Sequence, residues 1–169
     1  MEFVFPQEKY LPSYAKAYAE DVAVNEGELQ MLIHPDVAIS RSESERRGEG
    51  LPAGYVPATT LWLVDDEKFI GRVNIRHHLT DSLLRYGGHI GYMIRPSEQG
   101  KGYGRLQLAM ALDYCRAHFD FDRVLVTCDD TNVRSARVIE ANGGVLQDKV
   151  ENAVGPGKTA LTRRYWIEL

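Results

Sequence analysis

The sequence predicts an α+β fold built on a mixed sheet. Three observations predict it: helical patterns open the chain, short apolar segments separated by turns fill its middle, and strand-like and helical segments alternate in its second half. The chain has 169 residues, of which 44% are hydrophobic and 26% are charged. That size and composition fit one domain, residues 1–169, with its own hydrophobic core.

The first 58 residues predict a short strand, two helices and a long loop. Glu2–Phe5 is strand-like, and Ser13 precedes apolar residues at the spacing of a capped amphipathic helix. A second helix is predicted over Pro35–Arg47, and glycine and proline residues then punctuate positions 48–57. Long loops in compact domains are usually functional, so Arg41–Thr59 is a candidate wall of a substrate site.

Residues 59–169 have a more regular pattern. Strands are predicted at Thr59–Val64, Phe69–His77, His89–Ile94, Arg123–Cys128, Val145–Val150 and Thr159–Ile167. Gly102–Phe119 predicts a helix with one apolar stripe. A further helix begins after a capping residue among Asp130, Thr131 and Asn132, and the run 142–144 ends it.

Composition excludes several classes of function. With 20 basic and 24 acidic residues the net charge is −4, so no basic field attracts nucleic acid. No segment reaches the roughly 18–20 apolar residues of a membrane span, and no signal peptide is visible. Cys115 and Cys128 lie in apolar segments and read as buried thiols, and Asp129-Asp130 lacks further ligands. We therefore expect a cytoplasmic protein without a metal site.

The segment Gln99–Arg105 carries the clearest chemistry. It follows a predicted strand, opens a helix and has glycine at every second position from 100 to 104. Glycine lets the backbone turn sharply and present successive N–H groups. Free N–H groups and the helix dipole favour an anion at a helix N-terminus, and Lys101 and Arg105 add positive charge. The segment therefore predicts a pyrophosphate site.

Two common phosphate motifs do not fit the chain. A dinucleotide loop needs G-x-G-x-x-G in a βαβ unit, but here the spacing is G-x-G-x-G after strands that look antiparallel. The run Gly157–Thr159 matches the end of a nucleotide P-loop, but Asn152 stands where its first glycine belongs. We expect Gly155–Thr159 to be a hairpin turn.

The spacing Q-x-x-G-x-G within Gln99–Gly104 resembles the signature of the GNAT superfamily of acetyl-CoA-dependent N-acetyltransferases. Gly88–Pro96 resembles the family's strand leading into that loop, and Asn132–Ser135 with Glu140–Gly144 resembles the following helix. The ending Arg164–Ile167 is similar to a poorly characterised subgroup of predicted acetyltransferases. The resemblance extends from about residue 59 to the last residue.

The resemblance implies a mainly antiparallel sheet of six to seven strands flanked by helices, with a central strand pair splayed apart. Residues 59–169 would form the cofactor-binding core, and residues 1–58 the variable helices and loop on the acceptor side. Acetyl-CoA would be the co-substrate, with its pantetheine arm bonded like an extra strand to the splayed edge. The implied cofactor-binding residues are Met93, Ile94, Arg95, Gln99, Gly100, Lys101, Gly102, Tyr103, Gly104, Arg105, Asn132 and Ser135.

The implied reaction is direct attack of an amine on the thioester in a ternary complex, with a backbone N–H near residue 93 or 94 holding the oxyanion. The strand before the loop has no carboxylate, so His89 is the predicted base, acting through water. A structural role for His89 remains open, and His77 or His78 can replace it. The family's frequent acid tyrosine is Ile139 here, which leaves Ser135 as a donor to the sulfur.

The predicted function is N-acetyl transfer to a small amine, an amino-terminus or a protein lysine. The alternative is a non-catalytic acyl-CoA-binding or regulatory module, which the vacant acid and base positions favour. A third interpretation, a nucleotide-binding domain, predicts ATP or NAD binding through the same loop. Dimers are common in the family, so a homodimer is among the expected assemblies.

Overall fold

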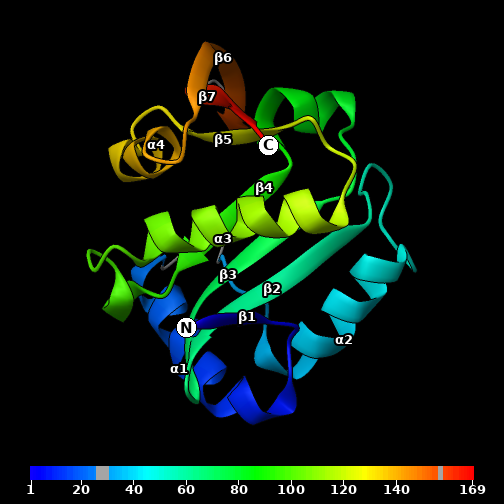
Figure 1. Cartoon of the computed structure of the whole chain (residues 1–169), viewed down its shortest axis with the longest axis vertical. Helices are drawn as coiled ribbons and strands as arrows, with labels where there is room; N and C mark the ends of the chain where they lie inside the picture. The colour runs from blue at the N-terminus through cyan, green and yellow to red at the C-terminus, as the bar shows by residue number, and fades with distance from the viewer. Residues whose placement is uncertain (26–30, 156–157) are drawn as a thin grey trace.

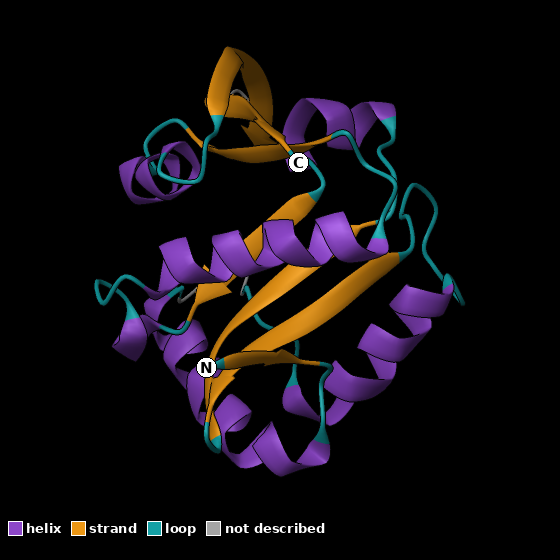
Figure 2. Cartoon of the chain, viewed as in Figure 1, coloured by secondary structure: helices purple, strands orange, loops and turns teal. Residues whose placement is uncertain are grey.

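The computed structural model describes residues 1–25, 31–155 and 158–169, which form a seven-stranded sheet with helices on both faces (Figures 1 and 2). The strands are β1 (Glu2–Val4), β2 (Ala58–Asp65), β3 (Lys68–Arg76), β4 (Ile90–Ile94), β5 (Arg123–Asp129), β6 (Val145–Gly155) and β7 (Lys158–Glu168). The α-helices are α1 (Leu11–Val24), α2 (Pro35–Arg47), α3 (Tyr103–His118) and α4 (Val133–Glu140). Short helical turns are η1 (Glu8–Tyr10), η2 (Leu83–Gly87) and η3 (Pro96–Glu98).

The sheet order is β1-β2-β3-β4-β5-β7-β6, and β4 with β5 is the parallel pair among antiparallel neighbours. The predicted α+β fold with a mixed, mainly antiparallel sheet is therefore confirmed. The strands predicted between positions 59 and 128 agree with the structure to within about two residues at each end. The helix η2 was not predicted, because its polar sequence has no helical period of apolar residues.

Each face of the sheet has its own apolar core. On one face α3 and α4 cover β2–β5 and β7, where Leu108, Val126 and Ile139 are fully buried. Figure 1 shows α3 crossing in front of this face. On the other face α1 and α2 cover β2 and β3, and the Tyr14 and Trp62 rings stack with their centroids 4.4 Å apart. A side chain of β3 or β4 therefore faces either α3 and α4 or α1 and α2, depending on the core to which it belongs.

The junction of β4 and β5 is confined to one end of the two strands. Ile90 opposite Val126 is the bridging pair of the ladder, and β4 ends four residues later without another. Beside it, the His89 N–H donates to the Leu125 carbonyl at 2.7 Å. The Leu125 N–H in return donates to His89 Nδ1 at 2.9 Å. The strands diverge beyond this point, so the predicted splayed pair is present.

A glycine allows this junction to form. Gly88 has φ +65°, and a Cβ there would lie 2.5 Å from the Leu125 carbonyl oxygen. A side chain at this position would both strain the backbone and force β5 away from β4. Gly88 therefore sets the contact from which the two strands diverge.

The helix α1 begins at Leu11, so the prediction that Ser13 caps it is wrong. Pro12 occupies the first turn, where its missing N–H costs nothing. Ser13 lies inside the helix because its hydroxyl serves tertiary structure: Oγ accepts from the Phe69 N–H at 3.0 Å and from Arg95 Nη1 at 3.3 Å. The predicted cap of α4 is confirmed at Asn132, whose Oδ1 accepts from the Ser135 N–H at 3.0 Å.

A buried ion pair fixes α1 to the end of β4. Arg95 is 6% exposed and donates through Nε and Nη2 to the two carboxylate oxygens of Glu20. The same carboxylate accepts from the Ser97 N–H at 3.1 Å and from the Ser97 hydroxyl at 3.0 Å. Hydrogen bonds from Arg95, followed by those from Ser97, lower the pKa of Glu20 to about 2.

The predicted hairpin turn at Gly155–Thr159 falls partly outside the described residues. Gly155 pairs with Lys158, and Ala153 pairs with Thr159, in the antiparallel β6–β7 ladder. Residues 156 and 157 lie outside the described part of the chain.

Replacing Glu20 with Gln should lower the free energy of unfolding by about 1–3 kcal/mol at neutral pH, because Arg95 loses a charged acceptor. The folded-state pKa is depressed, so this stabilisation is present above pH 4.5 and is lost as the pH falls toward 2. Urea unfolding of both proteins over that range should show the difference shrinking with acidification. Glu43→Gln, at an exposed position on α2, is the control, and a constant difference at all pH values would contradict this account.

Candidate functional site

The connection from β4 to α3 presents an open, glycine-lined surface. After the turn η3, Gly100 has φ +80° and Gly102 has φ +84°, a left-handed conformation that favours glycine. A Cβ built on either residue would meet no atom within 4 Å. These two glycines therefore meet a backbone requirement, and their outer side is free for a ligand to approach.

The start of α3 has unpaired backbone donors. Within the described part of the chain, the N–H groups of residues 100–105 have no hydrogen-bond acceptor. The helix also has no side-chain cap, although it is 16 residues long. Successive free N–H groups at a helix N-terminus attract an anion through their dipoles. This arrangement fits a phosphate or pyrophosphate group.

The charged residues of the loop differ in their availability. Glu98 is 5% exposed and accepts from both Lys101 Nζ, at 3.0 Å, and Lys68 Nζ. Hydrogen bonds from these lysines lower the pKa of Glu98. Lys101 is thus held beside the loop by a buried carboxylate. Arg105 has no hydrogen bond from its guanidinium in the part of the chain that the structure describes.

Two other predicted loop residues, Gln99 and Gly104, lie against protein atoms and not on the open side of the loop. Gln99 Nε2 donates to the Ile94 carbonyl at 3.1 Å and so closes the end of β4. A Cβ on Gly104 would lie 3.5 Å from Val138 Cγ2 and 3.9 Å from Ile94 Cγ1. Gly104 therefore faces α4 and β4, at distances where a Cβ would make ordinary van der Waals contacts. Tyr103 is partly buried against the small cluster that includes Ile94.

The edge of β4 that faces β5 is set by alternation along the strand. The Arg95 N–H donates to the Ile70 carbonyl, and the His89 carbonyl accepts from the Arg76 N–H, so the odd-numbered residues bond to β3. The backbone groups of Tyr92 and Ile94 then point toward β5, where the strands have separated. Of the predicted contacts Met93, Ile94 and Arg95, only Ile94 has its backbone on this open edge.

A hydroxyl pair lies at the opening between β4 and β5. The Tyr92 hydroxyl is 2.9 Å from Ser135 Oγ, which comes from the first turn of α4. Cys128 lies two residues beyond Val126 on β5, as Tyr92 lies two residues beyond Ile90 on β4, so the two face each other across the opening. Burial raises the pKa of Tyr92 to about 12, which keeps the phenol protonated at neutral pH.

The prediction from sequence missed Tyr92. It considered histidine and carboxylate side chains of the strand and a tyrosine at position 139, which is a buried isoleucine. The period-two alternation from Ile90 would have placed Tyr92 on the face of α4, where Ser135 is.

His89 is engaged by the strand junction. It is 8% exposed and packs on the Phe121 ring with centroids 4.9 Å apart. Burial first, and then the positive charge of Arg76, lower its pKa to about 4. Because Nδ1 accepts the Leu125 N–H, the proton of the neutral ring is on Nε2, and neither nitrogen has a free lone pair.

The other histidines considered for the base have different surroundings. His77 Nε2 is 2.9 Å from the Thr59 hydroxyl, and burial lowers the pKa of the His77 ring. His78 follows the end of β3 and is exposed. Within the described residues, no group of three or more histidine, cysteine or acidic side chains could hold a metal ion. No helix of this described part is long and apolar enough to cross a bilayer.

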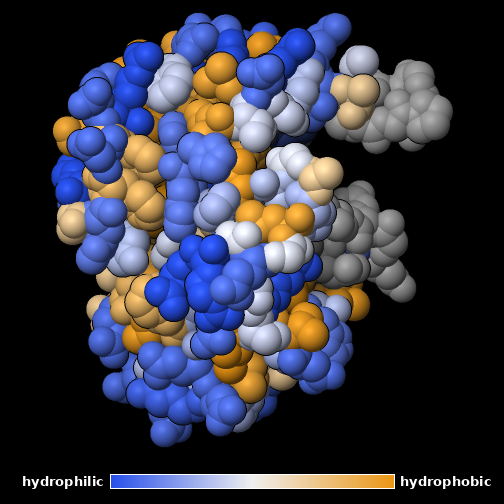
Figure 3. All heavy atoms as spheres, turned by 90° about the vertical axis from the view of Figure 1, so that its right-hand side faces the viewer, coloured by the Kyte–Doolittle hydropathy of each residue, from blue (hydrophilic) through white to orange (hydrophobic). Residues whose placement is uncertain are grey.

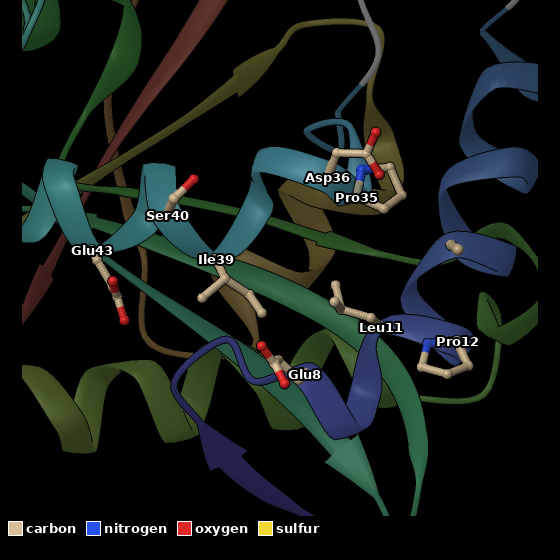
Figure 4. A pocket seen from close by; sticks show the side chains of 9 residues that line it. Glu8, Leu11, Pro12, Pro35, Asp36, Ile39, Ser40 and Glu43 are labelled. Atoms are coloured by element: carbon tan, nitrogen blue, oxygen red, sulfur yellow. The ribbon is translucent and has the colours of Figure 1, made fainter.

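The predicted substrate wall, Arg41–Thr59, comprises the second half of α2, an irregular loop and the start of β2. Figure 3 shows the side of the molecule on which α2 lies, and its surface is mostly hydrophilic with small groups of apolar residues. A separate groove lies between η1, α1 and α2 (Figure 4) and is lined by Glu8, Leu11, Pro12, Ala15, Pro35, Asp36, Ile39, Ser40 and Glu43. None of these lining residues belongs to β4, to α4 or to the glycine loop.

Comparisons with known proteins agree with this geometry. The model of the acetyltransferase (GNAT) domain matches residues 6–145. Among proteins of curated function, no sequence relative matches the chain.

Solved structures share the fold at low sequence identity. The putative acetyltransferase yncA from Salmonella typhimurium, solved with acetyl-CoA, is 14% identical, with a TM-score of 0.68 over 99% of this chain and 92% of that one. RimL, a ribosomal L7/L12 α-N-protein acetyltransferase solved with coenzyme A, is 16% identical, with a TM-score of 0.71 over 99% and 93%. The spermidine N-acetyltransferase SpeG from Vibrio cholerae is 18% identical, with a TM-score of 0.67 over 99% and 95%. By its fold, its strand–loop–helix geometry and the domain match, the chain belongs to the GNAT acetyltransferase family.

Proposed function

We propose that this protein transfers the acetyl group of acetyl-CoA to an amine acceptor in a ternary complex. The observation that carries the proposal is the run of free N–H groups at residues 100–105, which follow the end of β4 that has separated from β5. A pyrophosphate fits the first feature and a strand-like pantetheine arm fits the second. The acetyl-CoA-bound relative of the same fold supports this assignment.

The residues have separate roles in this proposal. The N–H groups of 100–105 bind the pyrophosphate, and Lys101 and Arg105 add positive charge beside it. The exposed N–H groups of Tyr92 and Ile94 bind the pantetheine arm, and Asn132 and Ser135 lie on the opposite side of the opening. Acetyl-CoA supplies the activated thioester.

We assign the proton donor of the leaving thiolate to Tyr92. Its hydroxyl is already hydrogen-bonded at the opening, and its high pKa keeps the proton in place until a strong acceptor develops. Ser135 orients that hydroxyl from α4. The tyrosine on β4 would therefore protonate the leaving thiolate, which is the role that a tyrosine at the position of Ile139 has in many members of the family.

We propose that His89 positions the strands. The sequence-based hypothesis that it is the general base stays a prediction, but the one basic lone pair of the neutral ring, on Nδ1, accepts the Leu125 N–H in this arrangement.

The relatives acetylate a polyamine and a protein amino-terminus, so both classes of acceptor enter the proposal. If acetyl-CoA binds but no amine in a broad panel releases CoA, the chain is the non-catalytic module instead.

Gly102→Ala should weaken acetyl-CoA binding about 10- to 100-fold, because the methyl group projects into the space where N–H groups meet the phosphate. Gly143→Ala is the matched control: Gly143 has φ +85°, against +84° for Gly102, and a Cβ there also meets nothing within 4 Å. Backbone strain should thus be similar in both variants. Calorimetric titration with acetyl-CoA measures the difference, and equal affinities in both variants would remove the loop from the binding site.

Tyr92→Phe should lower kcat about 10- to 100-fold while changing the Kd of acetyl-CoA by less than about threefold, because only the proton donor is removed. Tyr114→Phe, which removes another partly buried phenol from α3, should leave kcat unchanged. Steady-state kinetics of CoA release tests both variants. An unchanged kcat in Tyr92→Phe would exclude this role.

His89→Asn should leave kcat within about threefold of the original and preserve the pH–rate profile, whereas removal of a general base costs about 10²–10⁴-fold. The amide oxygen of Asn can replace Nδ1 as acceptor for Leu125. The folded-state pKa of His89 is depressed, so the original protein loses stability as the pH falls from 6.5 to about 4. Denaturation across that range should show a weaker pH dependence in His89→Asn, and a collapsed kcat would restore the base assignment.

A further inference from the structure

Polar side chains of β3 line the face of the sheet opposite Tyr92. Arg72, Asn74 and Arg76 alternate with the buried Val73 and Ile75, so they share the face that α1 and α2 cover. Trp62 lies on the same face beside Arg72, and it belongs to the core under these helices. Two half-buried arginines therefore lie on the strand next to β4, which borders the opening. Charged side chains in such a position need a partner or a function.

Both arginines lie on β3, the strand that pairs with β4. Arg72 is paired with Met93 across the β3–β4 ladder. The Nη1 and Nη2 atoms of Arg76 lie 3.9 Å and 4.0 Å from the position that a Cβ on Gly91 would take. Arg72 is thus opposite Met93 in the ladder, and the Arg76 guanidinium lies beside the backbone of β4 at Gly91.

The positive charges are not neutralised within the described residues. Arg72 Nη1 donates to the Met31 carbonyl at 2.7 Å. Arg76 Nη1 donates to the carbonyls of Gly87 and Gly88 at 2.9 and 3.0 Å. In the part of the chain that the structure describes, neither arginine has a carboxylate within 4.0 Å, and their Nε and Nη2 groups have no acceptor.

Other charged groups on this face are already engaged. Glu45 raises the pKa of both arginines, but its carboxylate is bound to Arg41 Nε at 2.8 Å. The buried Asp21 accepts from the Leu32 N–H at 2.7 Å and from Asn25. Burial is the main cause that lowers the pKa of Arg76, and the charge of Arg72 adds to it. An anion bound beside the two arginines would offset the repulsion between their charges.

We propose that Arg72 and Arg76 form an anion subsite, and that the acceptor is an amine carrying a carboxylate or a phosphate group. This inference rests on the proposed function, because it places the acceptor on the α1 and α2 side of β4. The anionic group binds the free guanidinium N–H groups, and the amine lies toward the opening. A polyamine is disfavoured, since its second positive charge would approach two arginines.

The proposed subsite also affects the protonation state of the acceptor amine, for which no general base is assigned. Neighbouring positive charges favour the neutral form of an amine and so lower the pKa of its ammonium group. Two guanidinium groups beside the acceptor therefore increase the fraction that is ready to attack, and the anionic group holds the acceptor there. This arrangement reduces the need for a carboxylate on β4, where this chain has none.

The test compares matched pairs of acceptors. One pair is 4-aminobutyrate and 4-aminobutanamide, a second is phosphoethanolamine and ethanolamine, and spermidine represents the polyamines. CoA release should favour at least one anionic member over its neutral partner about 10-fold or more. The carboxylate and phosphate pairs distinguish the two anions. Preference for the neutral members or for spermidine would overturn the proposal.

Variants then assign the effect to the arginines. Arg72→Gln and Arg76→Gln should each raise KM for the preferred anionic amine about 10- to 100-fold and leave the Kd of acetyl-CoA unchanged. Arg72→Lys, which keeps the charge, should recover part of the loss. Arg116→Gln, in an exposed ion pair on α3, is the control. An unchanged KM in both glutamine variants would refute the subsite.

A binding measurement separates this proposal from the proposed function. The same amines are titrated into the CoA-loaded protein by calorimetry. One outcome is that no amine is acetylated, but an anionic amine binds and the glutamine variants lose that binding. In that case the proposal of acetyl transfer is wrong, and the proposal of an anion subsite is supported. If acetylation proceeds without any anionic preference, acetyl transfer stands and the subsite is wrong.

Discussion

The contact between His89 and Leu125 is the point on which the rest of the site depends. Two hydrogen bonds, one from each residue, join β4 to β5 where their single bridging pair lies. Without this junction the sheet would separate into two halves, and with a longer ladder it would have no opening. Because β4 leaves β5 immediately afterwards, the backbone groups of Tyr92 and Ile94 lack a strand partner. One short contact thus gives both continuity of the sheet and an accessible strand edge.

In these proposals, the two sides of the opening recognise their ligands by different means. On the side of α3, the donors are backbone N–H groups, whose positions depend on glycine conformation and on the ion pair between Arg95 and Glu20. On the side of α1 and α2, the donors are the side chains of Arg72 and Arg76. Backbone recognition suits a pyrophosphate common to all acyl-CoA substrates, whereas side-chain recognition can change with the acceptor.

Much of the fold was predictable because it depends on local patterns. The boundaries of β2 to β5 and the cap at Asn132 follow from apolar patterns and from capping chemistry, whereas β6 runs to Gly155, five residues beyond the predicted end at Val150. The helix over Pro35–Arg47 was also predicted, although its second half is polar. Ser13 shows the limit of such reasoning. Its sequence context is that of a cap, but its hydroxyl bonds to Phe69, which is 56 residues away. Local chemistry alone cannot indicate whether a hydroxyl will accept from an N–H of its own helix or from an N–H of a distant segment.

The sequence by itself determined the cofactor side of this protein. A glycine loop between a strand and a helix leaves the first N–H groups of the helix without acceptors, and the cause of this lies in neighbouring residues. Only the tertiary structure decided the chemistry at the opening. It paired Tyr92 with Ser135, engaged Nδ1 of His89 with the Leu125 N–H and brought Arg76 of β3 beside Gly91. These relations join residues far apart in the chain, and the register of neighbouring strands fixes them.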